Sequence, residues 1–218
     1  MNNVLVVALH PDDETLGCGG TLLKHKGNGD KIHWLICTTI SKNHKYHTLR
    51  EKEIDLVSSM YEFDTVHNLR LKTTQVDEYT VSDLVGRVSK IMNEVQPNIV
   101  YLPFKGDVHS DHSYMFKAAY SCTKIFRYPF VKKIYMMETL SETEFSVSTK
   151  EDSFVPNVFV DISEYMDKKI ELMNTYRNEI GKHPFPRNER NIRALATYRG
   201  ATSGCEYAES FMLLKEIT

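Results

Sequence analysis

Short apolar runs alternate, along the first two thirds of the chain, with segments whose apolar residues recur every three or four positions. Residues 4–9 form an unbroken apolar run rich in β-branched side chains, and a His-Pro pair follows it. Such a run is typical of a strand buried on both faces of a parallel sheet. Similar runs predict further strands at 32–39, 65–71, 98–103 and 133–138.

The segments between these runs have helical spacing, at 19–26, 49–62 and 81–95. Alternating strands and helices imply right-handed crossovers, and so a Rossmann-like α/β fold with a doubly wound, mostly parallel sheet flanked by helices. Ligands of such sheets bind outside the carboxyl ends of the strands, near the point where the strand order reverses. Polar motifs that directly follow strands are therefore the first candidates for a site.

The final third of the chain has a different pattern. A short strand is expected at 158–161, then a helix from Ser163, as its N-cap, to about residue 180. A proline-broken loop, HPFPRNER, separates this helix from another at about 188–198. We interpret this part as a C-terminal extension of helices and strand within one domain that covers residues 1–218.

The first polar cluster, HPDDE, directly follows the first predicted strand. It brings His10, Asp12, Asp13 and a third acid together within five residues. Neighbouring carboxylates repel and lose solvation there, and a bound divalent metal offsets both penalties most simply. His10 and Asp13 can both point at one ion, which leaves Asp12 free to act as a base. A single acid at this place would be explained as a helix cap, but capping does not require the histidine.

The second cluster, DVHSDHS, follows the predicted strand at 98–103 and places His109 and His112 on either side of Asp111. A catalytic zinc is usually held by three protein ligands and keeps one open position. His10, Asp13 and one of these two histidines would complete that set. The other histidine could donate a proton to a leaving amine or stabilise an oxyanion, with Asp111 or Asp107 controlling its tautomer and pKa.

Composition limits the range of functions. The chain has 218 residues, of which 41% are hydrophobic and 26% charged, and its formal net charge is -2. It lacks the basic excess of a nucleic-acid-binding protein. Its four cysteines show no CxxC spacing, so reduced, buried thiols are expected. The first residues have no basic segment before the apolar run, and that run is too short for a signal peptide or a membrane span. These features favour a cytoplasmic protein.

The two clusters resemble the motifs of the LmbE-like, or PIG-L-type, N-acetylglucosaminyl deacetylase family, in which HPDDE follows a strand and HPDH occurs later in the chain. Here the second motif is HSDH, with Ser110 in place of the proline. The resemblance implies that His10, Asp13 and His112 bind one zinc ion per chain, with Fe²⁺ as an alternative. It also implies that Asp12 is the general base, with His109 as the acid or oxyanion stabiliser.

The resemblance extends to other parts of the chain. Arg50 begins a segment similar to the Arg-x-x-Glu of the family, where the arginine contacts substrate. The end of the chain, including Tyr207, is also similar, and a place for Tyr207 in the substrate pocket follows from it. Arg187, in the proline-broken loop, would suit a polyhydroxylated or anionic glycoside.

The function expected from these residues is zinc-dependent hydrolysis of the N-acetyl group of a small amino-sugar substrate, such as an N-acetylglucosamine derivative, in carbohydrate metabolism. In this scheme Asp12 takes a proton from water during attack on the acyl carbonyl, and a protonated His109 assists the departing nitrogen. Two alternatives are a metal-dependent phosphoesterase and a metal- or nucleotide-binding module without hydrolytic activity. A homo-oligomer is compatible with the sequence. The sequence does not identify which N-acetylated sugar is the substrate.

Overall fold

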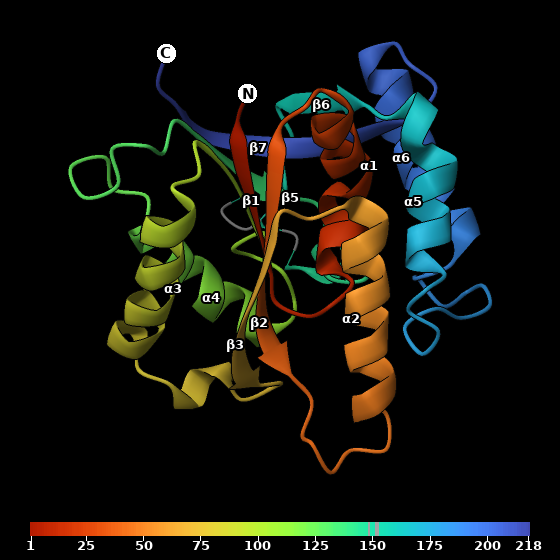
Figure 1. The fold of residues 1–218 in the computed structure, drawn as a ribbon. Helices are drawn as coiled ribbons and strands as arrows, with labels where there is room; N and C mark the ends of the chain where they lie inside the picture. Colours follow the sequence, from red (N-terminus) through yellow and green to blue (C-terminus); the bar gives the residue numbers. More distant parts are fainter. Residues whose placement is uncertain (148, 151–152) are drawn as a thin grey trace.

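A seven-stranded sheet forms the centre of the protein in the computed structural model, which describes residues 1–147, 149–150 and 153–218 (Figure 1). The strand order is β3-β2-β1-β4-β5-β7-β6. The strands are β1 (Asn3–Ala8), β2 (Lys31–Thr39), β3 (Thr65–Lys72), β4 (Ile99–Leu102), β5 (Lys133–Met137), β6 (Val158–Asp161) and β7 (Ala208–Glu216). The first five strands pair in parallel, whereas β7 is antiparallel to both of its neighbours. The predicted mostly parallel α/β sheet is therefore confirmed.

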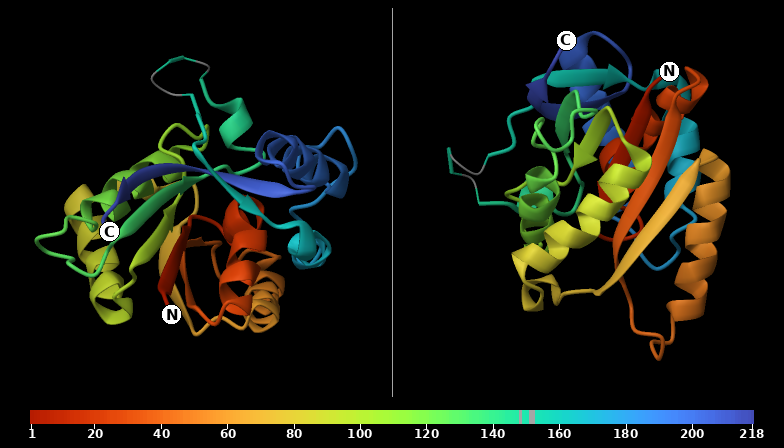
Figure 2. Two further views of the ribbon diagram at one scale, coloured as in Figure 1. Left: turned by 90° about the horizontal axis from the view of Figure 1, so that it is seen from above. Right: turned by 60° about the vertical axis from the view of Figure 1, so that its left-hand side comes forward.

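Helices cover both faces of the sheet, as Figure 2 shows from two further directions. They are α1 (Asp13–Gly27), α2 (His47–Tyr61), α3 (Val81–Val95), α4 (Ser110–Ser121), α5 (Met166–Met173) and α6 (Glu189–Ser203). One hydrophobic core joins the sheet to α1, α2, α5 and α6, and the other joins it to α3 and α4. The central strands are buried on both faces because apolar side chains alternate between these two cores. None of the described helices is long and apolar enough to cross a membrane.

The strand order reverses between β1 and β4. The chain moves from β1 outward to β2 and β3, and then returns through α3 to place β4 on the other side of β1. Val4 and Val6 of β1 pair with Ile99 and Tyr101 of β4. The carboxyl ends of these two strands therefore lie side by side, and the turns that carry the two polar clusters meet there.

The structure differs from the sequence-based expectation mainly in the last third. The helix expected over 163–180 is a 3-10 turn, Ser163–Tyr165, followed by α5, which ends at Met173. Ser163 does not cap this helix because its backbone N–H and hydroxyl both donate to Asp161, at 2.9 and 2.6 Å. The helix α4 and the long strand β7 had no separate prediction, although the sequence indicated a strand in the C-terminal extension.

Candidate active site and metal centre

The turn after β1 holds its acids in a strained conformation. Asp12 has φ 143° and ψ -26°, a region that residues other than glycine rarely adopt. Its carbonyl accepts the first hydrogen bonds of α1, from the N–H groups of Thr15 and Leu16. Its own N–H donates to the carboxylate of Glu14 at 3.0 Å. Strain of this kind persists only where the surroundings enforce it, and it concentrates at functional sites.

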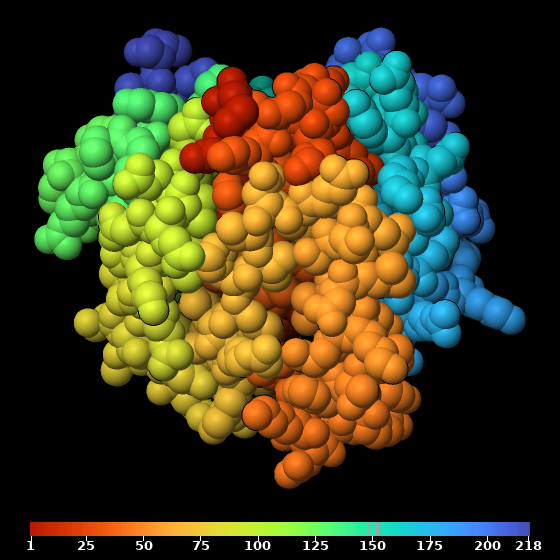
Figure 3. All heavy atoms as spheres, in the orientation of Figure 1, coloured from red at the N-terminus to blue at the C-terminus, as the bar shows by residue number. Residues whose placement is uncertain are grey.

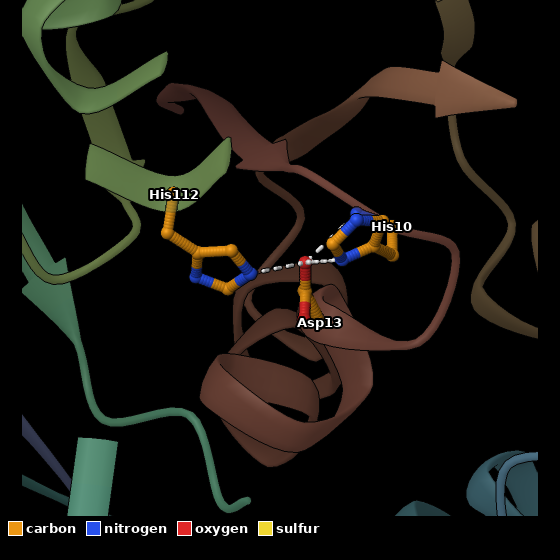
Figure 4. A group of neighbouring side chains, drawn as sticks. All are labelled: His10, Asp13 and His112. Atoms are coloured by element: carbon orange, nitrogen blue, oxygen red, sulfur yellow. Dashed lines mark hydrogen bonds and ion pairs between the residues drawn. The ribbon is translucent and has the colours of Figure 1, made fainter. Parts of the chain in front are cut away.

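The three expected ligand residues, His10, Asp13 and His112, converge beyond this turn (Figure 4). One carboxylate oxygen of Asp13 lies 3.7 Å from Nδ1 of His10 and 3.4 Å from Nε2 of His112. One donor atom from each of the three residues lies within 4.8 Å of the others. Asp13 and His112 are buried, and His10 is partly exposed toward the adjacent cavity. Two nitrogens and one oxygen form a donor set that suits zinc.

The far side of His112 is fixed by an acid. Its Nδ1 lies 2.8 Å from a carboxylate oxygen of Asp107, whose other oxygen accepts from the hydroxyl of Thr143 at 2.6 Å. A proton on Nδ1 leaves the lone pair of Nε2 facing the cluster. That Nε2 is buried and, like Nε2 of His10, has no hydrogen-bond partner among the described residues. A histidine backed by a carboxylate, with its second nitrogen free, is the usual arrangement of a metal ligand. The residues therefore fit a divalent cation.

The charges of this cluster shift its pKa values in opposite directions. Burial acts to raise the pKa of Asp13, but the charges of His112 and His10 outweigh it and hold that pKa well below its usual range. Burial acts to lower the pKa of His112, yet Asp13 and Asp107 raise it well above the ordinary value. The site therefore has a negative field that favours a proton or a cation beside Asp13.

Asp12 points away from this cluster, toward Arg187. One of its carboxylate oxygens accepts a hydrogen bond of 2.8 Å from Nη1 of Arg187. The side chain is only 2% exposed. Burial, together with the charge of Asp13, raises its pKa well above the usual value, although Arg187 opposes the rise. A carboxylate whose pKa lies nearer neutrality is a better general base than an exposed one.

His109 ends the turn before α4 and caps that helix. Its Nδ1 accepts a hydrogen bond of 3.2 Å from the backbone N–H of Asp111. Burial and the neighbouring His10 and His112 lower its pKa. The lowered pKa favours the neutral ring over the protonated one expected from the sequence, and the bond accepted by Nδ1 places the proton of a neutral ring on Nε2. A neutral ring of this tautomer still donates one hydrogen bond.

Asp111 does not set the tautomer of His109 with its carboxylate, since only its backbone contacts that ring. The carboxylate accepts from the N–H groups of Thr74 and Val76, at 2.7 and 3.2 Å, and lies 3.6 Å from Nε2 of His10. It thereby ties the segment after β3 to the site. His10, His109 and Asp111 also form a second group whose donor atoms could hold an ion, but it shares His10 with the first.

A cavity of about 200 Å³ opens beside these residues. Its lining comprises His10, Pro11, Asp12, Thr39, Ile40, Arg50, Thr73, His109, Glu142, Glu179 and Arg187. The guanidinium of Arg50 donates to the carbonyl of Pro11 at 2.8 Å and pairs with Glu179, which also contacts Arg187 at 3.2 Å. Arg50 and Arg187 therefore lie where a substrate would meet them.

Tyr207 lies elsewhere. Its backbone N–H donates to Ser163 and its carbonyl accepts from Ile162, just before β7 begins. Its ring packs against the hydrophobic core on the α1 side of the sheet, and it is not among the residues that line the cavity. Glu179 was missed by the sequence analysis. It lies beyond the end of α5, and no local pattern marks an acid at that position as part of a site.

Comparisons with known proteins found a matching family and several relatives. Residues 5–123, which include both polar clusters, match the family PIG-L, described as GlcNAc-PI de-N-acetylase. A diacetylchitobiose deacetylase of Thermococcus kodakarensis is 24% identical over 230 residues, which cover 100% of this chain and 85% of that protein. A Bacillus anthracis protein named probable N-acetyl-α-D-glucosaminyl L-malate deacetylase 2 is 21% identical over 190 residues, 81% of each protein.

Solved structures share the fold. A conserved protein of Thermus thermophilus superposes with a TM-score of 0.81 and 25% identity, covering 100% of this chain and 97% of that one. A 4-carboxy-2-hydroxymuconate hydratase of Pseudomonas putida has a TM-score of 0.77 and 16% identity, over 100% and 98% of the two chains. Since the same fold also hosts a hydratase, the chemistry has to be argued from the residues of the site.

Proposed function

Because this chain belongs to the PIG-L family of GlcNAc-PI de-N-acetylases, we propose that it hydrolyses the N-acetyl amide of a small substrate that contains N-acetylglucosamine, with one zinc ion per chain. The relatives named as deacetylases of diacetylchitobiose and of N-acetylglucosaminyl malate support this substrate class. The reaction releases acetate and leaves a free amine on the sugar.

The observation that carries the proposal is the convergence of two histidine rings on the Asp13 carboxylate, with the buried Nε2 of His112 left without a hydrogen-bond partner among the described residues. Nδ1 of His10 and Nε2 of His112 would hold the ion together with the Asp13 carboxylate. A divalent cation held there would polarise the acyl carbonyl and would lower the pKa of its bound water to about 7. Buried polar atoms without a partner are unfavourable, and coordination would remove that penalty.

The residues of the chain divide the proton transfers between them. Asp12 accepts the proton of the attacking water, and Arg187 keeps its carboxylate in place. The Nε2–H of neutral His109 donates a hydrogen bond to the oxygen that gains negative charge as the carbonyl is attacked. The proton taken up by Asp12 then passes to the departing nitrogen as the C–N bond breaks, so that the carboxylate is regenerated.

The glycine-rich segment after HPDDE does not form a phosphate-binding loop, which disfavours a nucleotide-binding module. Gly17, Gly19 and Gly20 lie within α1 and are buried. A Cβ atom at Gly20 would lie 2.7 Å from Ile162, and one at Gly19 would lie 2.6 Å from the hydroxyl of Tyr61. These glycines allow α1 to pack closely against its neighbours.

Two substitutions test the proposal. Asp12→Asn should retain the metal and lower kcat by about 10²–10⁴-fold because the base is lost, whereas His112→Ala should lose the metal itself. The measurements are metal content per chain and acetate release from N-acetylglucosamine, diacetylchitobiose and N-acetylglucosaminyl malate. Full activity of both variants would refute the scheme. Failure of the unmodified protein, as well as of the variants, to hydrolyse any of these amides would also refute it.

A further inference from the structure

A second and larger hollow continues from the site cavity along the surface. It has a volume of about 520 Å³ and lies between the segment that follows β2 and the end of β3. Figure 3 shows the surface hollowed between the orange atoms of the α2 region and the gold atoms of the β3 region. Thr39, Ile40 and Thr73 line both cavities. A ligand in the site cavity can therefore extend into this hollow, which we call the basic groove.

The charges that line the basic groove have one sign. Lys42, Arg70 and Lys72 line it together with His44 and His47, and none of its described lining residues is an acid. Arg70 and Lys72 reach acids only outside the groove, Glu51 at 3.3 Å and Glu78 at 3.4 Å. The Arg70 and Lys72 side chains are 53% and 66% exposed, whereas Glu51 is 33% exposed and also lies 4.0 Å from Nε2 of His47. Because the two cations face water, they remain available to a ligand.

In the site cavity, by contrast, the arginines are already neutralised by acids. Arg50 and Arg187 line it, but each is already paired with an acid: both contact Glu179, and Arg187 also contacts Asp12. A further anion there would have to displace these carboxylates. The site cavity therefore suits the neutral acetamido sugar, and the basic groove suits a negative group attached to it.

The backbone turns cationic groups toward the groove. Along β3 the register with β2 shifts by one residue, so that Ile36 pairs with Asn68 but Thr38 pairs with Leu71. Arg70 lies at this bulge with φ 51°, and its N–H donates to the side chain of Asn68 at 2.7 Å. A bulge redirects side chains near a site; here Leu71 stays in the core while the Arg70 side chain is 53% exposed.

The start of α2 adds to the positive field. Helix α2 begins at His47, on the groove, and has neither an acid in its first turn nor a side-chain cap from Tyr46. The positive end of a helix dipole normally attracts such an acid. At this helix no acid of the first turn offsets the dipole, and Glu51, just beyond that turn, lies 4.0 Å from Nε2 of His47.

From this arrangement we infer that the basic groove binds an anionic aglycone, so that the substrate is an N-acetylglucosamine conjugate whose second part carries a carboxylate or a phosphate. The inference rests on the proposed function, which places the acetamido sugar in the site cavity. It separates this chain from enzymes of neutral chitooligosaccharides, whose second part is an uncharged sugar.

The test compares kcat/KM for acetate release, at low and high ionic strength, from N-acetylglucosaminyl malate, N-acetylglucosamine 1-phosphate and the neutral methyl glycoside of N-acetylglucosamine. At low salt an anionic substrate should exceed the neutral one by about tenfold or more, through a lower KM, and salt should erase the advantage. The better of the two anions identifies carboxylate or phosphate as the preferred group.

Charge removal tests the same point by a second route. The triple change Lys42→Gln, Arg70→Gln and Lys72→Gln should lower the ratio of anionic to neutral kcat/KM by about tenfold or more. The matched control, Lys90→Gln, Lys124→Gln and Arg127→Gln, removes three exposed cations that line neither cavity and should leave this ratio unchanged.

The outcomes separate the two proposals. Equal kcat/KM for neutral and anionic substrates in the unmodified protein, without salt dependence, overturns the inference but leaves the deacetylase intact. A triple variant that folds and keeps the anionic preference also overturns it. Acetate release from none of the substrates overturns the proposed function, and the inference with it.

Discussion

Two neighbouring groups of charged residues differ in how their charges are balanced. The inner cluster consists of His10, Asp13, Asp107 and His112. The arginine layer consists of Arg50, Glu53, Glu179 and Arg187. In the inner cluster two buried ring nitrogens have no partner among the described residues. In the arginine layer Glu53 Oε2 and Arg187 Nε also lack a hydrogen-bond partner among the described residues, but each guanidinium is paired with an acid, and Glu179 joins the two arginines.

This difference indicates that the inner cluster binds a ligand, whereas the arginine layer orients the side chains of the site. Unpartnered donor atoms around a buried carboxylate require a ligand to satisfy them, so the inner cluster is built for a cation. A layer in which every arginine is paired with an acid holds its members, and Asp12 with them, in one geometry before substrate arrives. Asp12 lies between the two groups: Arg187 contacts its carboxylate, and Glu14 accepts its backbone N–H.

The largest effect is expected at Glu14, which the arginine layer does not reach. Its recorded hydrogen-bond partners are the N–H of Asp12 and the hydroxyls of Thr15 and Tyr176. Burial raises its pKa from 4.5 to about 7. The folded state therefore holds this proton to higher pH than the unfolded state, so its stabilising contribution is complete below about pH 4.5 and is lost as the pH rises through about 7.

Glu14→Gln should remove this dependence. Between pH 4.5 and 8 the metal-free unmodified protein should lose about 3 kcal/mol of unfolding free energy relative to the variant. Urea unfolding across that pH range measures the difference. Glu94→Gln, on the exposed part of α3, is the control and should track the unmodified protein. Parallel curves for Glu14→Gln and the unmodified protein would show that Glu14 is not a buried, titrating acid.

A smaller effect is expected at Asp107, behind His112. Asp107→Asn weakens the hydrogen bond that orients the His112 ring, so metal affinity should fall by about 10–100-fold. Turnover should recover at saturating metal because no ligand atom has been removed. Competition with a chelator measures the affinity, and Asp55→Asn, on the exposed face of α2, controls for the lost charge. Unchanged affinity would mean that Asp107 does not support a metal ligand.

The smallest effect is expected in the arginine layer. The charge of Arg187 lowers the pKa of Asp12, so Arg187→Met should raise that pKa. Because the base acts when ionised, the acidic limb of the kcat/KM profile should move to higher pH by about one unit. Arg190→Met, three residues along and exposed, should leave the limb in place. A shift toward lower pH would contradict the assignment of Asp12 as the base.

The two groups also differ in how far the sequence reveals them. The inner cluster was anticipated because His10 and Asp13 follow the end of β1, His112 lies at the start of the helix that follows β4, and parallel strands bring those ends together. The resemblance to the PIG-L family was needed to choose His112 over His109. The arginine layer joins residues from α2, from beyond α5 and from the loop before α6, so Glu179 could not be identified and the contact of Arg187 with Asp12 was not anticipated.

The sequence by itself determined the strand and helix alternation of the first two thirds, the residues of both polar clusters and the family. These features are local, since apolar periodicity and short spacings do not depend on the rest of the chain. Only the tertiary structure decided that β7 runs antiparallel between β5 and β6, that Asp107 supports His112, that His109 caps α4 and that Tyr207 faces the core. Each of these depends on hydrogen bonds and burial, which sequence spacing alone does not specify.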